Sequence, residues 1–266
     1  MRCLSLPLSV RFGRMNRQMV DRSPLSEPTV LPLRTITTIA AGSALVVAPH
    51  PDDETLGCGG AIALMRSLGC PVRLLVISDG TMSHPRSRKY PTTALRALRE
   101  AETRLALSVL GVEASAITFL RLQDGAIATL KSSDIRDAVA ICRTCLAAFA
   151  PKTIFLPWRY DPHSDHRATS KLIHTALVGL ALSPRLIEYP IWDWDREQRG
   201  SLPDSERVMA WRLDISEALE LKQKAIAAYR SQTTNLIDDD PQGFRLTPEM
   251  LTNFSRPWEV YLEKLE

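Results

Sequence analysis

Residues 44–54 read ALVVAPHPDDE, and the architecture of the chain follows from this stretch. Its first part, Ala44–Ala48, is a continuous apolar run, which is typical of a strand buried on both faces of a parallel sheet. The polar residues after it, beginning at His50, stand where such a strand ends. Since ligands bind beyond the carboxyl ends of strands in open parallel sheets, the stretch predicts a central strand that leads directly into a functional loop.

Apolar runs and helical patterns alternate along the chain after this stretch. We expect strands over residues 44–48, 72–77, 117–120, 153–156, 186–189 and 208–213, and helices over residues 56–68, 92–110, 133–150, 167–182 and 216–230. Such alternation implies right-handed βαβ units and a mainly parallel sheet flanked by helices. The sequence therefore predicts a Rossmann-like α/β fold in a single domain.

The two ends of the chain lack this periodicity. Residues 1–40 contain four prolines and no clear pattern, so we expect a flexible leader there. Residues 41–235 would form the domain itself. Residues 236–266 are polar at first and end in a segment that contains tryptophan, and we expect a C-terminal tail that packs on the domain.

The bulk composition excludes several classes of protein. The chain has 266 residues, of which 45% are hydrophobic and 24% charged, as in an ordinary globular protein. It has no apolar run of about 18 residues, so we expect no membrane span. The net charge of +3 includes no clustered basic run, so we expect no nucleic-acid partner. Five cysteines without a recognisable export signal favour a reducing, cytoplasmic location.

The loop after the first strand reads His50-Pro51-Asp52-Asp53-Glu54. His50 and Asp53 are three residues apart, which lets an imidazole and a carboxylate converge on one zinc ion and leaves Asp52 to accept a proton from water. The alternative is that the three acids only stabilise the start of the next helix through its macrodipole. A helix start needs only one acid, so three of them beside a histidine favour the metal interpretation.

A second polar motif, Asp161-Pro162-His163-Ser164-Asp165-His166, follows the strand expected at residues 153–156. One histidine can bind metal while the other, held by Asp161 or Asp165, acts as an imidazolium acid. A single histidine is more often structural, but two histidines and two aspartates at a second strand end favour chemistry. Together the two motifs supply His50, Asp53 and His166, a three-ligand set typical of catalytic zinc, and Fe²⁺ also suits such a set.

The pair of motifs, HPDDE at residues 50–54 and H-x-D-H at residues 163–166, resembles the LmbE/PIG-L family of N-acetylglucosaminyl deacetylases. The likeness runs from about residue 44 to about residue 232, with weaker matches at residues 78–80, 99–102, 110–112 and 122–125. It implies a zinc hydrolase on a Rossmann-like sheet that removes an acyl group, expected to be acetyl, from the nitrogen of an amino-sugar conjugate.

The resemblance also implies a role for each matching residue. It implies that His50, Asp53 and His166 bind the metal, that Asp52 is the general base, and that His163, oriented by Asp165, stabilises the oxyanion or protonates the amine. Arg99 matches an arginine that contacts substrate. Asp161 stands where some members carry a tyrosine that polarises the carbonyl, so we expect it near the substrate as well.

Other interpretations remain open. A metal-retaining carbohydrate-binding module without catalytic activity is the main alternative, although it needs neither Asp52 nor His163. Glycines at residues 57–60 lack the spacing of a dinucleotide site, so we expect them to let a helix approach the sheet. We expect Cys142 and Cys145 to be buried core thiols. The loops 83–91 and 192–205 and the tail should select the group attached to the sugar; the sequence fixes neither that group nor the oligomeric state.

Overall fold

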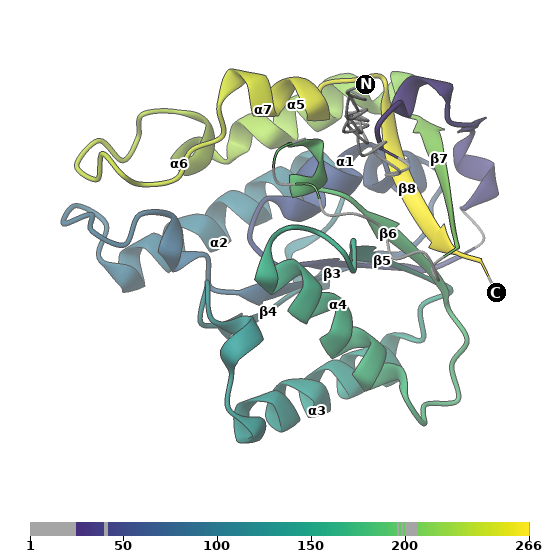
Figure 1. The fold of residues 1–266 in the computed structure, drawn as a ribbon, viewed down its shortest axis with the longest axis horizontal. Coiled ribbons are helices and arrows are strands. Elements are labelled where there is room, and N and C mark those ends of the chain that lie inside the picture. Colours follow the sequence, from purple (N-terminus) through teal and green to yellow (C-terminus); the bar gives the residue numbers. More distant parts are fainter. Residues whose placement is uncertain (1–24, 40–41, 196, 198, 200–206, 266) are drawn as a thin grey trace, which may run out of the picture.

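The computed structural model describes residues 25–39, 42–195, 197, 199 and 207–265. They form one eight-stranded sheet with helices on both faces (Figure 1). The strands are β1 (Leu33–Arg34), β2 (Ala44–Ala48), β3 (Val72–Ser78), β4 (Ile117–Leu122), β5 (Thr153–Pro157), β6 (Arg185–Tyr189), β7 (Val208–Asp214) and β8 (Trp258–Lys264). Their order is β1-β7-β8-β6-β5-β2-β3-β4, and only the two pairs made by β8 are antiparallel. The predicted Rossmann-like, mainly parallel α/β fold is confirmed.

Helices cover both faces of the sheet. Successive side chains of a central strand point to opposite faces, and here those on both faces are apolar. The helices are α1 (Asp53–Ser67), α2 (Thr92–Val109), α3 (Ser132–Phe149), α4 (Ser164–Leu177), α5 (Leu219–Ala228), α6 (Arg230–Thr233) and α7 (Pro248–Phe254). Val46 of β2 packs into a core with α1, α2 and α5, whereas Val47 packs into a second core with α3 and α4. The sheet is therefore a layer between two hydrophobic cores, as its continuous apolar strands predict.

Helix α1 lies close against the sheet because its glycines have no side chain. A Cβ atom on Gly57 would lie 2.3 Å from Cδ2 of Tyr189, and one on Gly60 would lie 2.6 Å from the side chain of Ile215. Neither contact is possible in a packed interior. The interpretation of these glycines as packing residues is confirmed.

Several helix boundaries differ from the expected ones: α4 ends at Leu177 rather than at residue 182, and two other differences concern the site. Helix α1 begins at Asp53 and α4 begins at Ser164, in each case three residues earlier than expected, so both polar motifs run into the first turn of a helix. The helix expected at residues 216–230 is divided at Tyr229, whose ψ of 62° is not helical. The Tyr229 hydroxyl donates to the buried Glu54 carboxylate, which fixes this break against α1.

The C-terminal tail contributes a strand that the sequence pattern did not predict. β8 lies between β6 and β7, in the interior of the sheet (Figure 1). Its residue Glu259 is buried and accepts hydrogen bonds from the Gly60 and Ala61 amides and from Lys222 Nζ, at 2.7, 2.9 and 2.8 Å. A buried carboxylate is tolerated because these donors compensate its lost hydration. The tail is thereby joined to α1 and α5.

The expected leader, residues 1–40, is described only from 25 to 39; residues 1–24 and 40 lie outside the described residues. Within this part, β1 pairs in parallel with β7, and Leu25 and Ile39 are buried. The domain limits at residues 40 and 235 stay predictions. Among the described helices, none has both the length and the apolar character needed to cross a bilayer.

Candidate active site

Both polar motifs lie where the strand order of the sheet reverses. From β2 the chain builds outward through β3 and β4, and it then returns to the other side of β2 to form β5 and β6. The loops that follow β2 and β5 therefore lead to helices on opposite faces and leave a crevice between them. The first motif follows β2 and the second follows β5, so the fold itself brings them together.

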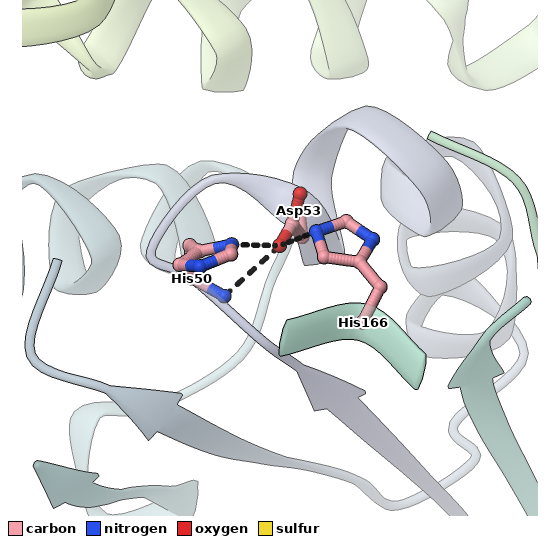
Figure 2. Close-up of side chains that lie close together, drawn as sticks. All are labelled: His50, Asp53 and His166. Carbon is pink, nitrogen blue, oxygen red and sulfur yellow. Dashed lines mark hydrogen bonds and ion pairs between the residues drawn. The ribbon is translucent and has the colours of Figure 1, made fainter. Parts of the chain in front are cut away.

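Three side chains from these loops converge at one point (Figure 2). Asp53 Oδ2 lies 3.1 Å from His50 Nδ1 and 3.2 Å from His166 Nε2. The potential ligand atoms of these three residues all lie within 4.8 Å of one another. The rings of His50 and His166 are 5.3 Å apart between centroids, which is close enough for both to bind one ion.

In both His50 and His166, the outer ring nitrogen, which is the one that does not face Asp53, lies close to carboxylates. His50 Nε2 lies 3.2 Å from Asp124 Oδ1 and 3.4 Å from Asp165 Oδ2. His166 Nδ1 lies 3.4 Å from Asp161 Oδ2. Histidines that bind metals almost always donate their other N–H to such a group, which fixes the tautomer and the ring orientation. His50 would then bind through Nδ1, and His166 through Nε2.

The chemistry of this donor set fits a divalent metal ion. His166 is completely buried, and within the described part of the chain its Nε2 makes no well-formed hydrogen bond. A buried imidazole nitrogen without such a bond is costly unless another group, such as a metal, engages it. Two neutral imidazoles and one carboxylate suit zinc and also Fe²⁺. Despite its burial, the pKa of Asp53 is lowered by His166 and His50, so its carboxylate is ionised as a ligand must be.

Asp52 lies beside this cluster without being part of it. It precedes α1 with an unusual φ of 120°, and its side chain makes no capping hydrogen bond to the helix. Such backbone strain in a non-glycine residue is found at functional sites. Burial raises the pKa of Asp52 to about 8, with the carboxylates of Asp53 and Glu54 adding to the rise and Arg99 opposing it. The arrangement argues against the helix-start interpretation of this acid.

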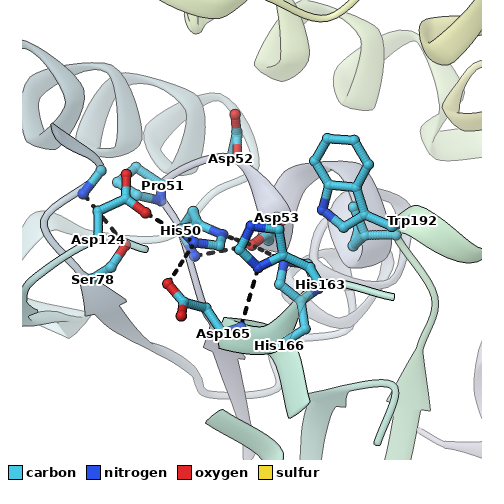
Figure 3. Close-up of polar contacts among 12 residues, drawn as sticks. His50, Pro51, Asp52, Asp53, Ser78, Asp124, His163, Asp165, His166 and Trp192 are labelled. Carbon is cyan, nitrogen blue, oxygen red and sulfur yellow. Dashed lines mark hydrogen bonds and ion pairs between the residues drawn. The ribbon is translucent and has the colours of Figure 1, made fainter. Parts of the chain in front are cut away.

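His163 lies close to both ligand histidines, with ring centroids 4.9 Å from His50 and 5.1 Å from His166 (Figure 3). Its Nδ1 accepts a hydrogen bond of 3.2 Å from the backbone N–H of Asp165. A nitrogen that accepts carries no proton, so the proton of the neutral ring is on Nε2. Burial, together with the charges of His166 and His50, lowers the pKa of His163 to about 4. The structure thus favours a neutral donor where the sequence suggested an imidazolium.

Asp165 holds a different residue from the one expected. Its carboxylate accepts from the amides of Gly125 and Ile127, at 2.8 and 3.2 Å, and faces His50. Only its backbone N–H is bonded to His163. The residue therefore orients His163 through the first turn of α4, and its side chain steadies His50.

Arg99 and Asp161, the two expected substrate contacts, have other neighbours in the structure. Arg99 is buried, lines the cleft and donates to Asp52 Oδ2 at 3.1 Å, and it also donates to the Pro51 and Gly80 carbonyls. Asp161 is completely buried and is not among the residues that line the cleft. Its Oδ2 faces His166, and its Oδ1 accepts from the His163 amide at 2.9 Å. In this position Asp161 contacts both histidines and lies behind the lining of the cleft.

Asp124 is a site residue that sequence reasoning missed. It follows β4 and reaches His50 because β4 pairs with β3, beside β2. Although burial opposes it, the hydrogen bond from His50 and the positive charges nearby lower the pKa of Asp124 to about 2. The only sequence signal was the weak match at residues 122–125, which gave no role to this carboxylate.

The cluster opens into a cleft of about 1140 Å³. At the edge of the sheet lies what we call the polar base: His50, Asp52, Asp53, Asp124 and His163. Away from the sheet lies what we call the apolar wall: Met82, Trp192, Trp194, Phe244 and Met250. The wall comes from the expected loops 83–91 and 192–205, or residues beside them, and from the tail; of the second loop, residues 196, 198 and 200–205 lie outside the described residues.

Comparison with known proteins identifies what the site resembles. The family model described as PIG-L, GlcNAc-PI de-N-acetylase, matches residues 45–177. The Bacillus subtilis (strain 168) protein named "Probable N-acetyl-alpha-D-glucosaminyl L-malate deacetylase 2" is 29% identical over 224 residues, which cover 82% of this chain and 95% of that protein. The diacetylchitobiose deacetylase of Thermococcus kodakarensis is 27% identical, over 71% of this chain and 69% of its own length.

A solved structure agrees with these relatives. The structure of N,N'-diacetylchitobiose deacetylase from Pyrococcus horikoshii, in complex with an inhibitor, is 25% identical to this chain. The match covers 82% of each chain with a TM-score of 0.57. The matched family segment includes both polar motifs, the residue Arg99 and the residue Asp124.

Proposed function

This chain belongs to the PIG-L family, and from that membership we propose that it is a metal-dependent hydrolase that removes the acetyl group from the nitrogen of an N-acetylglucosamine conjugate. One observation carries the proposal. His50, Asp53 and His166 converge as ligands, while the unligated Asp52 and His163 lie next to them. A site that only binds metal needs neither of these two residues.

The metal we propose is zinc, with Fe²⁺ as the alternative. His50 Nδ1, Asp53 and His166 Nε2 would hold it, and three protein ligands leave a position open for water and substrate. When bound, the ion supplies a Lewis acid that makes water acidic and polarises the amide carbonyl. The carboxylates of Asp124, Asp165 and Asp161 would keep the two imidazoles in their ligating orientation.

Asp52 is the proposed general base. Its carboxylate would take a proton from water as the water oxygen forms a bond to the amide carbon. The same group would return this proton to the sugar nitrogen as the carbon–nitrogen bond breaks, giving acetate and a free amine. Arg99 donates to Asp52 Oδ2 and to the Pro51 and Gly80 carbonyls, so it would hold the general base in place.

His163 is the proposed stabiliser of the oxyanion. Its Nδ1 is engaged by the Asp165 amide, so the N–H of Nε2 remains to donate to the carbonyl oxygen as negative charge develops there. A donor fixed in advance typically contributes about 2.7–4 kcal/mol to such a step. We propose that Asp161 positions His163 and His166 rather than touching the substrate.

Metal-dependent release of acetate tests this function. The purified full chain would be loaded with Zn²⁺ or Fe²⁺ and offered N-acetylglucosamine, diacetylchitobiose and N-acetylglucosaminyl malate. We expect acetate and amine to appear together from at least one of them, and to disappear after chelation. A chain that binds metal and sugar but releases no acetate would instead be the non-catalytic binding module.

We also propose a cytoplasmic location. The support is that Cys58, Cys142 and Cys145 are free thiols, two of them fully buried, which is typical of a reducing compartment.

A further inference from the structure

The cleft is larger than an amino sugar requires. Its volume of about 1140 Å³ lies above the range of roughly 300–1,000 Å³ that is typical for pockets that bind drug-sized molecules. The polar base uses only the part at the sheet edge, where the amide must lie. The remaining volume is lined by the apolar wall and by polar residues of the tail such as Gln242, Thr247 and Asn253, so the wall is the apolar part of the surface available to whatever is attached to the sugar.

Two aromatic members of the apolar wall form a row that starts at the reacting groups. Trp192 is stacked beside His163, with centroids 6.0 Å apart and ring planes 24° apart (Figure 3). Phe244 follows Trp192 at a centroid distance of 5.5 Å. Met82 also lines the cleft and is 51% exposed, so its side chain is available to a ligand there. Aromatic and methionine side chains that line a cleft suit an apolar ligand.

The wall is held in place by the tail. The Phe244 amide donates to the Ser83 carbonyl at 2.6 Å, which joins the tail to the loop that carries Met82. Asp239 accepts from the Ser87 hydroxyl and from the Arg88 and Lys89 amides, at 2.7, 2.8 and 2.9 Å. A surface fixed by so many hydrogen bonds is already formed before a ligand arrives, which lowers the cost of binding.

The charges around the wall do not favour an anion. Beyond the polar base, the charged lining residues are Arg99, Arg245, Asp195 and Glu249. Arg99 is engaged by Asp52, and the Arg245 guanidinium donates to Asn235 at 2.5 Å. Asn235 is neutral, so Arg245 keeps its charge, but the lining also carries the acids Asp195 and Glu249, and positive charge does not predominate there.

From these observations we infer that the apolar wall binds an uncharged, apolar group attached to the amino sugar. The inference rests on the proposed function, since it names the class of conjugate that the same site accepts. The sugar would lie between the polar base and Trp192, and the apolar group would extend along Phe244, Met250 and Met82.

Matched glycosides of N-acetylglucosamine test this inference. The hexyl and methyl glycosides of the same anomer differ only in apolar length, and N-acetylglucosaminyl malate supplies a charged comparison. We would measure acetate release by the metal-loaded full chain and, separately, binding by calorimetry. Burial of two methylene groups alone corresponds to about tenfold in kcat/KM or Kd, so we expect the hexyl glycoside to be preferred over the methyl glycoside by at least about tenfold.

Variants then locate the preference. Phe244→Ala and Met250→Ala should each bring the hexyl-to-methyl ratio closer to one. Leu105→Ala removes an exposed leucine on the outer side of α2, away from the cleft, and should keep the ratio of the parent chain. Two variants on different segments guard against loss of folding in either one.

The outcomes distinguish failure of the apolar inference from failure of the proposed function. Acetate release with equal rates for the hexyl and methyl glycosides, or with the malate conjugate preferred, overturns the apolar inference and leaves the proposed function intact. Tight binding of the hexyl glycoside without acetate release from any substrate supports the apolar wall and overturns the proposed function. Loss of preference in Leu105→Ala as well as in Phe244→Ala would show that the wall is not its source, which also overturns the inference.

Discussion

The polar base and the apolar wall are two regions of one cleft that are built in opposite ways. The base consists of charged groups that are mostly buried and come from loops at adjacent strand ends. The wall consists of half-buried or exposed apolar groups from segments that are far apart in the chain. Buried charges need partners at fixed distances, whereas apolar contact is non-directional and needs only an apolar side chain of suitable size at the position. The base therefore leaves a motif in the sequence, and the wall does not.

The largest expected effect on activity comes from removing a proposed metal ligand next to the polar base. His166→Ala should abolish bound metal, and with it all measurable acetate release, because His50 and Asp53 alone cannot complete the site. Metal content per chain measures this directly. His174→Ala, on the same helix but bonded to the Ser170 carbonyl, is the matched control and should keep its metal. A full metal complement in His166→Ala would remove this residue from the ligand set.

Within the polar base, Asp52→Asn distinguishes metal binding from proton transfer. The variant keeps the shape of the side chain but cannot accept a proton, so kcat should fall about 10²–10⁴-fold while metal content is retained. Rates and metal content measured on one preparation test both statements. If most of the rate survived, Asp52 would not be the base and the proton would have to pass through another group.

The supporting carboxylates should have a smaller effect. Asp124→Asn and Asp161→Asn each weaken the group that faces the outer nitrogen of a ligand histidine, so metal affinity or activity should fall about 10–100-fold. Competition with a chelator measures the affinity. A change in KM for the sugar at unaltered metal affinity in Asp161→Asn would instead restore its sequence-based role as a substrate contact.

The smallest effect is expected in the wall. A Cβ atom on Gly243 would lie 2.1 Å from Cδ2 of the buried His84, so Gly243→Ala must displace the tail next to Phe244. We expect the free energy of unfolding to fall by about 1–3 kcal/mol, as for other overpacked sites, and the preference for the hexyl glycoside to decrease. Gln242→Ala, at the neighbouring exposed position, removes only an exposed hydrogen bond from Arg86 and should lower the stability less than Gly243→Ala does. Unchanged stability and unchanged preference in Gly243→Ala would mean that the wall is not rigid.

Sequence reasoning was successful where function and local pattern coincide. The apolar run Ala44–Ala48 and the alternation after it predicted strands β2 to β7, and the two motifs predicted the cluster that the structure brings together. Asp124 was missed because its role arises only when β4 pairs with β3, which no local spacing reveals. The hydrogen bond that His163 Nδ1 accepts was also missed, because its donor is a backbone amide in the first turn of α4.

Strand β8 and the apolar wall show more clearly what the sequence pattern cannot predict. β8 contains Glu259, which reads as a solvent-facing residue, and its burial depends on donors distant in sequence, Lys222 and the amides of α1, together with the Tyr261 hydroxyl. Trp192 and Phe244 lie 52 positions apart and meet only because the tail returns to the loop at Ser83. Hydrophobic periodicity reports burial within one element and cannot report such a return.

The interior position of β8 has a consequence for how the protein forms. In the described chain, β1 and β7 are hydrogen-bonded to the rest of the sheet only through β8, which follows all other strands in sequence. During synthesis, the edge formed by β6 stays open until residues 258–264 emerge from the ribosome. An open strand edge is a template for pairing with other chains, so aggregation during translation should be most acute in this interval. A chain interrupted before β8 would leave that edge permanently exposed.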